Sequence, residues 1–243
     1  IQKLTLSGNY SWLNTYGNIS NDEAVDLTFD ATGNIIITGY FTGGVDFDAN
    51  PVFSHVLTSN NIIFQDAFVQ KITALGAHVW TKNIGGSNHD CGLGVHVDLI
   101  GNINYTGFFQ GQNVDFDPGV NSSDVFTSNG QEDVFFSKLT SDGNYLSTKT
   151  IGGVGVDWGG TLVSDVNGNV YLSGFIQSLV DFNPPNNDYF QSFQNTIDAF
   201  SIKYKECYVS HDSLTIIQCG NYLAPDGQTY TNSGIYTAII VNS

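Results

Sequence analysis

Three observations in the sequence predict an all-β fold made of β-propeller blades, each a sheet of four antiparallel strands. The chain of 243 residues repeats itself about three times, with a period of 66–69 residues. Each repeat holds four short stretches in which apolar and polar residues alternate, and Gly-Asn turn sequences separate them. No apolar stripe with helical spacing lasts two turns. Because one such sheet cannot bury its faces alone, we expect the repeats to stack around an axis, as part of a larger ring or assembly.

The repeat is clearest in two segments that align without gaps. The first reads "IQKLTLSGNYSWLNTYG" from residue 1, "VQKITALGAHVWTKNIG" from residue 69 and "FSKLTSDGNYLSTKTIG" from residue 136. A fourth start, "DAFSIKY", lies at 198–204. The second segment contains the run "VDFD" at 45–48 and 114–117 and "VDFN" at 180–183. These in-phase copies fix the boundaries of the units.

The repeat predicts the following organisation. Residues 1–206 form the propeller repeats, with a partial blade at 1–22, blade one at 23–85, blade two at 86–152 and blade three at 153–206. The predicted strands are 23–30, 34–41, 66–72 and 77–84 in blade one, 91–98, 102–109, 133–139 and 144–151 in blade two, and 158–165, 169–175 and 198–204 in blade three. Since propellers typically close with four to eight blades, we expect the chain to be part of a longer polypeptide with further repeats, or to close by self-assembly.

The same positions resemble the bacterial β-propeller repeat family, whose units run "DAF…KL…G…W…GG…G…D…GN…YTG.F". The resemblance covers about residues 1–205 and differs at "YGN" in unit one and at Ser147, which replaces a Trp. It implies a propeller fold with shorter units, so we expect the "VDFDPG…FTSNG" segment to be an insertion. The matching residues in one unit are Asp66, Ala67, Phe68, Lys71, Gly76, Trp80, Gly85, Gly86, Gly101, Asn102, Tyr105, Thr106, Gly107 and Phe109.

The periodicity stops at Cys207, and residues 207–243 are a different segment. The stretch "CGNYLAPDGQTYTNSGIYTAIIVNS" resembles the start of a small β-module that recurs near the ends of secreted bacterial surface proteins, where a second Cys follows. Two alternatives stay open for the cysteines here: a Cys207–Cys219 disulfide, or pairing of Cys219 with a downstream partner. Cys91 is expected to be a buried, unreactive thiol.

The composition restricts the partners. The formal net charge is −16, and all seven basic residues are Lys. Nucleic acid and anionic membranes are therefore poor partners, because binding either depends on clustered Lys and Arg. No apolar run approaches the roughly 20 residues of a spanning helix, so membrane insertion is not expected. The chain opens in what looks like a strand, without the apolar core of a signal peptide, and we expect a segment upstream to have been cut away.

The D-x-D pairs Asp46/Asp48 and Asp115/Asp117, with Asp181 in the third copy, are the candidate metal ligands. Two carboxylates at i and i+2 lie on one side of an extended segment, and calcium takes such oxygen ligands. The spacing is not that of an EF-hand. The structural alternative, which we prefer, is that Val and Phe of the run pack between blades while the acids cap turns or pair with the recurring Lys.

Other reactive residue types give weak patterns. The recurring lysines, Lys3, Lys71, Lys138 and Lys203, serve each unit as solvated strand residues or as partners of a blade-edge Asp. His89, Asp90 and Cys91 form the one local cluster that hints at a metal or a Cys-His pair. Because no nucleophile motif and no phosphate loop accompanies them, the sequence predicts no catalytic residue and no enzyme.

Aromatic residues offer a ligand surface. Trp12 and Trp80 are repeat-equivalent and are expected to pack, whereas Trp158 lies off the pattern and is the better ligand-binding candidate. We therefore predict a non-catalytic extracellular scaffold or adhesive segment of a secreted or cell-surface bacterial protein, with a glycan or protein partner. Two alternatives stay open: the propeller portion of a secreted hydrolase or lyase whose active site lies outside this chain, and a subunit that polymerises through its blade ends.

Overall fold

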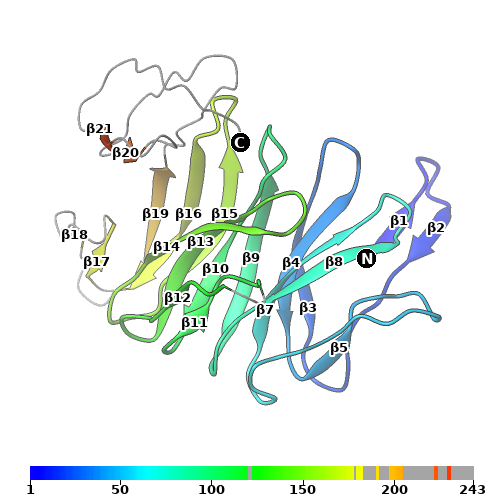
Figure 1. The fold of residues 1–243 in the computed structure, drawn as a ribbon, viewed down its shortest axis with the longest axis horizontal. Helices are drawn as coiled ribbons and strands as arrows, with labels where there is room; N and C mark the ends of the chain where they lie inside the picture. The colour runs from blue at the N-terminus through cyan, green and yellow to red at the C-terminus, as the bar shows by residue number, and fades with distance from the viewer. Residues whose placement is uncertain are drawn as a thin grey trace.

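A computed structural model describes residues 1–119, 122–177, 179–182, 190–191, 197–204, 222–223 and 229–230. In these residues the chain is all-β and contains no helix, and hence none long and apolar enough to cross a membrane. Its antiparallel sheets have two to four strands, and in the part of the chain described they form no closed barrel or closed propeller. Figure 1 shows the three larger sheets side by side in chain order.

These larger sheets confirm the predicted strands to within two residues. The first sheet has the order β3 (Glu23–Phe29), β4 (Ile35–Phe41), β7 (Asp66–Ile72) and β8 (His78–Ile84). The second sheet is β9 (Asp90–Val97), β10 (Ile103–Gln110), β13 (Glu132–Leu139) and β14 (Tyr145–Ile151). The third sheet is β15 (Trp158–Ser164), β16 (Val170–Gln177) and β19 (Ile197–Tyr204).

Among the described residues, five short hairpins accompany the larger sheets. The N-terminal hairpin pairs β1 (Gln2–Leu4) with β2 (Tyr10–Leu13). Three loop hairpins occupy the predicted insertion: β5 (Gly44–Asp46) with β6 (Val56–Thr58), β11 (Val114–Asp115) with β12 (Val125–Phe126), and β17 (Val180–Asp181) with β18 (Phe190–Gln191). In the tail β20 (Tyr222–Leu223) pairs with β21 (Thr229–Tyr230). Cys207 and Cys219 lie outside the described residues.

The sheets stack through their first strands. β9 contacts β3, β4 and β7 of the first sheet, and β15 contacts β9, β10 and β13 of the second. The approach is close at glycines in β9 and β15: a Cβ on Gly92 would lie 2.1 Å from the Thr38 hydroxyl, and one on Gly159 would lie 2.2 Å from the Thr106 hydroxyl. Glycine at these two positions is what lets neighbouring sheets pack this tightly.

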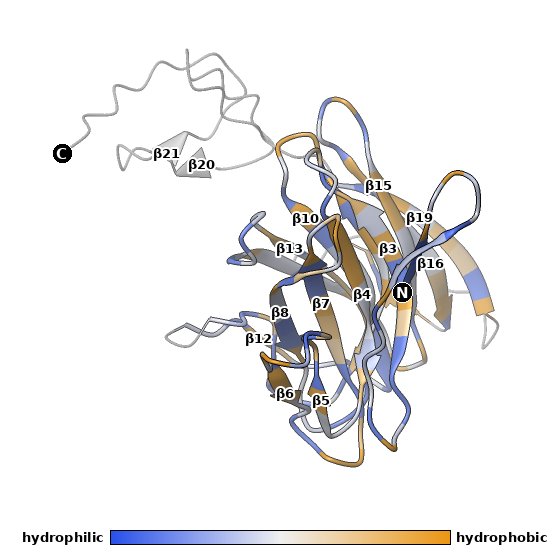
Figure 2. Ribbon diagram, turned by 90° about the vertical axis from the view of Figure 1, so that its right-hand side faces the viewer, coloured by the Kyte–Doolittle hydropathy of each residue, from blue (hydrophilic) through white to orange (hydrophobic). Residues whose placement is uncertain are grey.

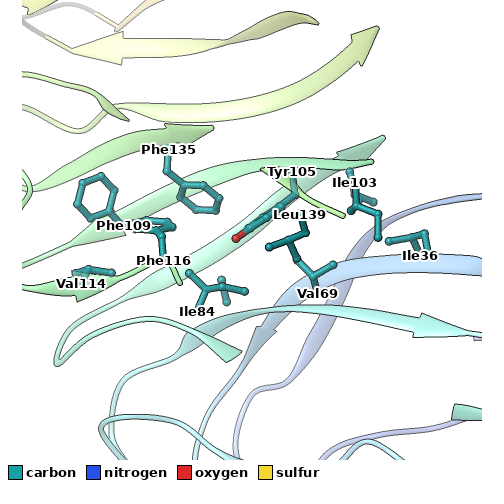
Figure 3. Packing of buried hydrophobic residues seen from close by; sticks show 12 residues of the cluster. Ile36, Val69, Ile84, Ile103, Tyr105, Phe109, Val114, Phe116, Phe135 and Leu139 are labelled. Carbon is teal, nitrogen blue, oxygen red and sulfur yellow. The ribbon is translucent and has the colours of Figure 1, made fainter. Parts of the chain in front are cut away.

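The space between the first and second sheets is filled by one apolar cluster. The first sheet contributes Ile36, Val69 and Ile84, and the second contributes Ile103, Tyr105 and Phe135, all at most 1% exposed. Figure 3 shows these side chains pointing toward one another, with Val114 and Phe116 closing the group from the loop hairpin. Side chains alternate between the two faces of each strand, so the opposite faces of β10 and β13 are available for the third sheet.

Similar clusters lie on either side of that one. Between the second and third sheets Val134 and Phe136 pack against Leu162, Val170 and Leu172. On the other face of the first sheet the N-terminal hairpin and the loop after it partly cover a third cluster, Ile35, Ile37, Phe41, Val45, Phe47, Phe68 and Ile72. In Figure 2 the second strand of the first sheet, β4, is mainly orange and the outer strand β8 mainly blue, because apolar residues concentrate where sheets meet.

The outer halves of successive sheets are joined by polar contacts that repeat. Lys3 donates from Nζ to the Ala74 carbonyl in the turn of the first sheet, at 2.8 Å, and Lys71 does the same to Ser141 in the second sheet, at 3.2 Å. A Cβ on Gly76 would meet the ring of Trp12, and one on Gly143 would meet the ring of Trp80. The two repeat-equivalent tryptophans therefore pack against the next sheet, as predicted.

Candidate functional site

The first Asp of each D-x-D pair caps the loop hairpin in which it lies. Asp46 accepts backbone N–H groups from Asp48 at 3.0 Å and His55 at 2.8 Å, and Asp115 accepts them from Asp117 and Asp124, both at 3.0 Å. The N–H of Asp48, followed by that of His55, lowers the pKa of Asp46. Each of these two carboxylates therefore caps backbone N–H groups within its own loop hairpin.

The second Asp has a more local role. Asp48 accepts the N–H of Asn50 at 3.0 Å, and Asp117 accepts that of Gly119 at 2.8 Å. Between the two acids, Phe47 and Phe116 are at most 1% exposed. Packing of the apolar residues and turn capping by the acids are thus confirmed for the first two copies; in the third, Val180 is buried and Asp181 is half-buried in β17.

Calcium binding at these loops stays a prediction. Within the described residues, no group of three or more His, Cys, Asp and Glu side chains is arranged to hold a metal ion. Calcium would therefore have to draw most of its oxygen ligands from backbone carbonyls and water.

The recurring lysines Lys71 and Lys138 form ion pairs with Asp residues that do not belong to the D-x-D pairs. Lys71 lies 3.0 Å from Asp30, and Lys138 lies 3.2 Å from Asp98. Each of these Asp residues also caps the Gly-Asn turn between the first two strands of its sheet, as Asp30 does for the N–H of Asn34 at 2.9 Å. The expectation of a blade-edge Asp partner is confirmed for these two lysines, and both are buried rather than solvated. Lys3 is exposed, and Lys203 lies 5.1 Å from the ring of Tyr171.

Sequence reasoning missed a second set of capping carboxylates at the start of each sheet. Asp22, Asp90 and Asp157 each accept two backbone N–H groups, one from four residues upstream and one from twenty residues downstream. Burial strongly raises the pKa of Asp90, and the charge of Asp66 raises it further. The sequence does contain a signal for these capping residues: in each repeat an Asp lies eight residues before the Asp of the Gly-Asn turn.

Another pair of buried carboxylates starts the third strand of the first two sheets. Asp66 and Asp133 are fully buried and accept N–H groups from Asn60 at 2.8 Å and Asn129 at 2.9 Å. Burial raises the pKa of Asp66 to about 6 and that of Asp133 to about 7. Perturbed carboxyls of this kind occur in catalytic sites, but these two recur in successive units and face backbone amides, which suits a structural role.

The His89, Asp90 and Cys91 side chains diverge. His89 packs edge-on against Phe64 at 4.7 Å, Asp90 caps backbone amides, and Cys91 accepts a hydrogen bond from Gln65 Nε2 at 2.9 Å. Burial raises the pKa of the Cys91 thiol to about 12. Cys91 is therefore buried and poorly nucleophilic, as predicted.

Trp158 lies between two other aromatic rings. It stacks on Phe108 at 4.7 Å, packs against Phe175 at 5.2 Å, and donates its indole N–H to Glu132 at 2.7 Å. These contacts join the second and third sheets. They give Trp158 a packing role, while its role as a ligand platform stays a prediction.

Two adjoining clefts of about 470 and 440 Å³ lie along the loops that join the first and second sheets. They share Ser87 and Gln112, and among the described residues that line them there is no Lys, His or Cys. Side-chain amides and hydroxyls line both clefts, and the larger one also holds the carboxylates of Asp115 and Asp117. The larger cleft is lined by Asn60, Asn83, Gly85, Gly86, Ser87, Gln112, Asn113, Asp115, Asp117, Pro118 and Gly119, and the smaller by Ser87, Asn88, Gly111, Gln112, Thr127, Ser128 and Gly130.

We call this pair of clefts the loop-edge groove. It offers many hydrogen-bond donors and acceptors, one pair of carboxylates and little apolar surface. Such a lining suits a hydrated, hydroxyl-rich ligand and offers no positive charge to an anion. No protein-family model matches the chain, and no curated protein is detectably similar to it.

Proposed function

We propose that the chain is a non-catalytic scaffold and binding segment of a secreted or cell-surface protein, and that its loop-edge groove binds glycans. The observation that carries the proposal is the lining of the groove: side-chain amides beside Asp115 and Asp117, with no Lys, His or Cys among the described residues that line it. Amide and carboxylate groups together donate to and accept from neighbouring sugar hydroxyls.

The sheet stacking supports a propeller-type scaffold for this groove. Each later sheet places its first strand against the sheet before it, the arrangement expected of blades around an axis. A rigid stack holds loops from successive units at fixed spacing, which favours weak multivalent contact with a repetitive ligand. A secreted or surface location fits such a partner and stays part of the proposal.

The test is a glycan array followed by titration of the best hit. Gln112→Ala should weaken the affinity about tenfold, because Gln112 lines both clefts. Gln131→Ala is the matched control, since Gln131 is also exposed but lines neither cleft. If no glycan binds, or if the two variants weaken binding equally, the groove is not the site.

A further inference from the structure

The first sheet and the loops next to it supply one wall of the loop-edge groove, and hydrogen-bond donors on this wall point into the protein. Asn60 donates to Asp66 from its backbone N–H at 2.8 Å and from Nδ2 at 2.9 Å, and Nδ2 also lies 2.8 Å from the Gly85 carbonyl. Gly86 donates its N–H to Asp90 at 2.7 Å. Because these donors are already used, this wall offers a ligand mainly acceptors.

The loop hairpin of the second sheet supplies the two carboxylates of the groove. Gly85 forms an antiparallel bridge with Asp115, so this hairpin lies directly beside the end of β8. Among the described residues, Asp115 and Asp117 accept backbone N–H groups at Oδ1 and no hydrogen bond at Oδ2. Each Oδ2 is therefore available to a ligand.

A third carboxylate lies directly behind Gly85, which lines the larger cleft. Asp66 is fully buried, and a Cβ on Gly85 would lie 2.7 Å from its Oδ1, an atom without a hydrogen-bond partner. Because Gly85 has no side chain, its backbone is what separates this oxygen from the groove. A buried acceptor without a partner is costly, and a positive charge placed nearby reduces that cost.

No positive charge at the groove offsets these three carboxylates. The described residues that line it include no Lys, and the whole chain carries a formal net charge of −16. A cleft lined by one sign of charge concentrates ligands of the opposite sign. A neutral sugar would bind the amides and hydroxyls of the groove and leave its carboxylates without a charge partner.

We propose that the loop-edge groove selects glycans that carry free amino groups, and that a sugar ammonium group binds at Asp115 and Asp117. An ammonium group donates three hydrogen bonds and accepts none, which suits a site made of acceptors. Hydroxyls of the same glycan bind Ser87 and Gln112, which line both clefts. This inference rests on the proposed glycan binding and adds the charge of the ligand.

The test compares two ligands that differ in charge. Calorimetry with the full chain, in the presence of a chelator, measures the affinity for a glucosamine oligomer and for the same oligomer after complete N-acetylation, which removes the positive charges and keeps the ring hydroxyls. The amino form should bind about tenfold more tightly, because charge-assisted hydrogen bonds are stronger than neutral ones. This preference should shrink as the salt concentration rises, because salt screens exposed charges.

Asp117→Asn should remove most of the preference for the amino form and leave the affinity for the N-acetylated form unchanged. The new amide keeps an oxygen that can accept the N–H of Gly119, so the hairpin is expected to stay closed. Asp48→Asn is the matched control, because Asp48 caps the N–H of Asn50 in the same way and lines neither cleft. Circular dichroism verifies that both variants fold.

The outcomes separate this inference from the proposed function. If neither oligomer binds and the glycan array is also negative, both fail. If the two oligomers bind equally, or if Asp48→Asn removes the preference as much as Asp117→Asn does, glycan binding stands and amino selectivity is overturned. Binding that requires added calcium would assign the carboxylates to a metal ion, and equal competition by oligolysine would assign the groove to a cationic peptide; either result also overturns the inference.

Discussion

The junction between the first and second sheets and the junction between the second and third share their backbone contacts and differ in their filling. In both, a threonine of the earlier sheet approaches a glycine of the later one, and a buried Asp at the start of the incoming sheet caps backbone amides. The centre of the first junction holds Ile36, and the repeat-equivalent residue of the second is Asn104, whose two amide atoms have no hydrogen-bond partner. The repeat thus preserves the contacts that satisfy buried backbone groups, while side chains between the sheets are free to diverge.

The largest effect should come from removing a ring that fills a junction. Phe116→Ala should lower the free energy of unfolding by about 3–5 kcal/mol, because Phe116 is fully buried among Phe109, Phe126 and Phe135. The repeat-equivalent Phe47→Ala should cost less, about 2–3 kcal/mol, because a cavity beside it lets the site relax. Urea titration of both variants measures the difference, and equal losses would contradict it.

The next largest loss of stability should come from replacing the buried lysines. Lys138→Met leaves the side chain of Asp98, which is 1% exposed, without its lysine partner, and should cost about 3 kcal/mol. Lys71→Met should cost less, because the side chain of its partner Asp30 is 12% exposed. The double variant Lys138→Met/Asp98→Asn should recover most of the loss in thermal melting. If it melts no higher than Lys138→Met, the ion pair is not what was disrupted.

Stability should depend on pH through the buried carboxyls. Burial raises the pKa of Asp133 from 3.8 to about 7, so the fold favours the protonated acid. This contribution is fully present below about pH 4 and is lost as the pH rises through 7, by on the order of 4 kcal/mol. Asp133→Asn should flatten the profile, whereas Asp142→Asn, at an exposed turn, should not. A stability that rises between pH 5 and pH 8 would contradict this account.

The smallest expected effect is an increase in stability. Asn104→Ile replaces a buried amide that has no partner by the residue type of the first junction, and should stabilise the chain by about 1 kcal/mol. Asn104→Ala separates polarity from volume, since it also removes the amide but leaves a void. Differential scanning calorimetry decides, and a loss in both variants would show that Asn104 has partners within the junction.

Strand positions were predictable from the sequence because they depend on local alternation and on turn glycines. Gly33 and Gly101 have φ of 82° and 88° at the ends of the predicted turns, and the predicted strand 66–72 is β7. The partners of Lys71 and Lys138 were not predictable, because pairing with a turn Asp depends on how strands of one sheet lie side by side. The same holds for the site: the D-x-D pairs were visible in the sequence, whereas the groove beside them needs residues from two sheets.

The lysine contacts between outer strands have one direction. Lys3 reaches forward to Ala74, and Lys71 reaches forward to Ser141, so the N-terminal hairpin and the first sheet each hold the donor for a turn that follows in the chain. A ribosome releases the earlier sheet first, and domains of this kind fold as they emerge. Each newly synthesised sheet can therefore dock on a sheet that has already emerged, and the apolar face of the earlier sheet is exposed only until the next unit covers it.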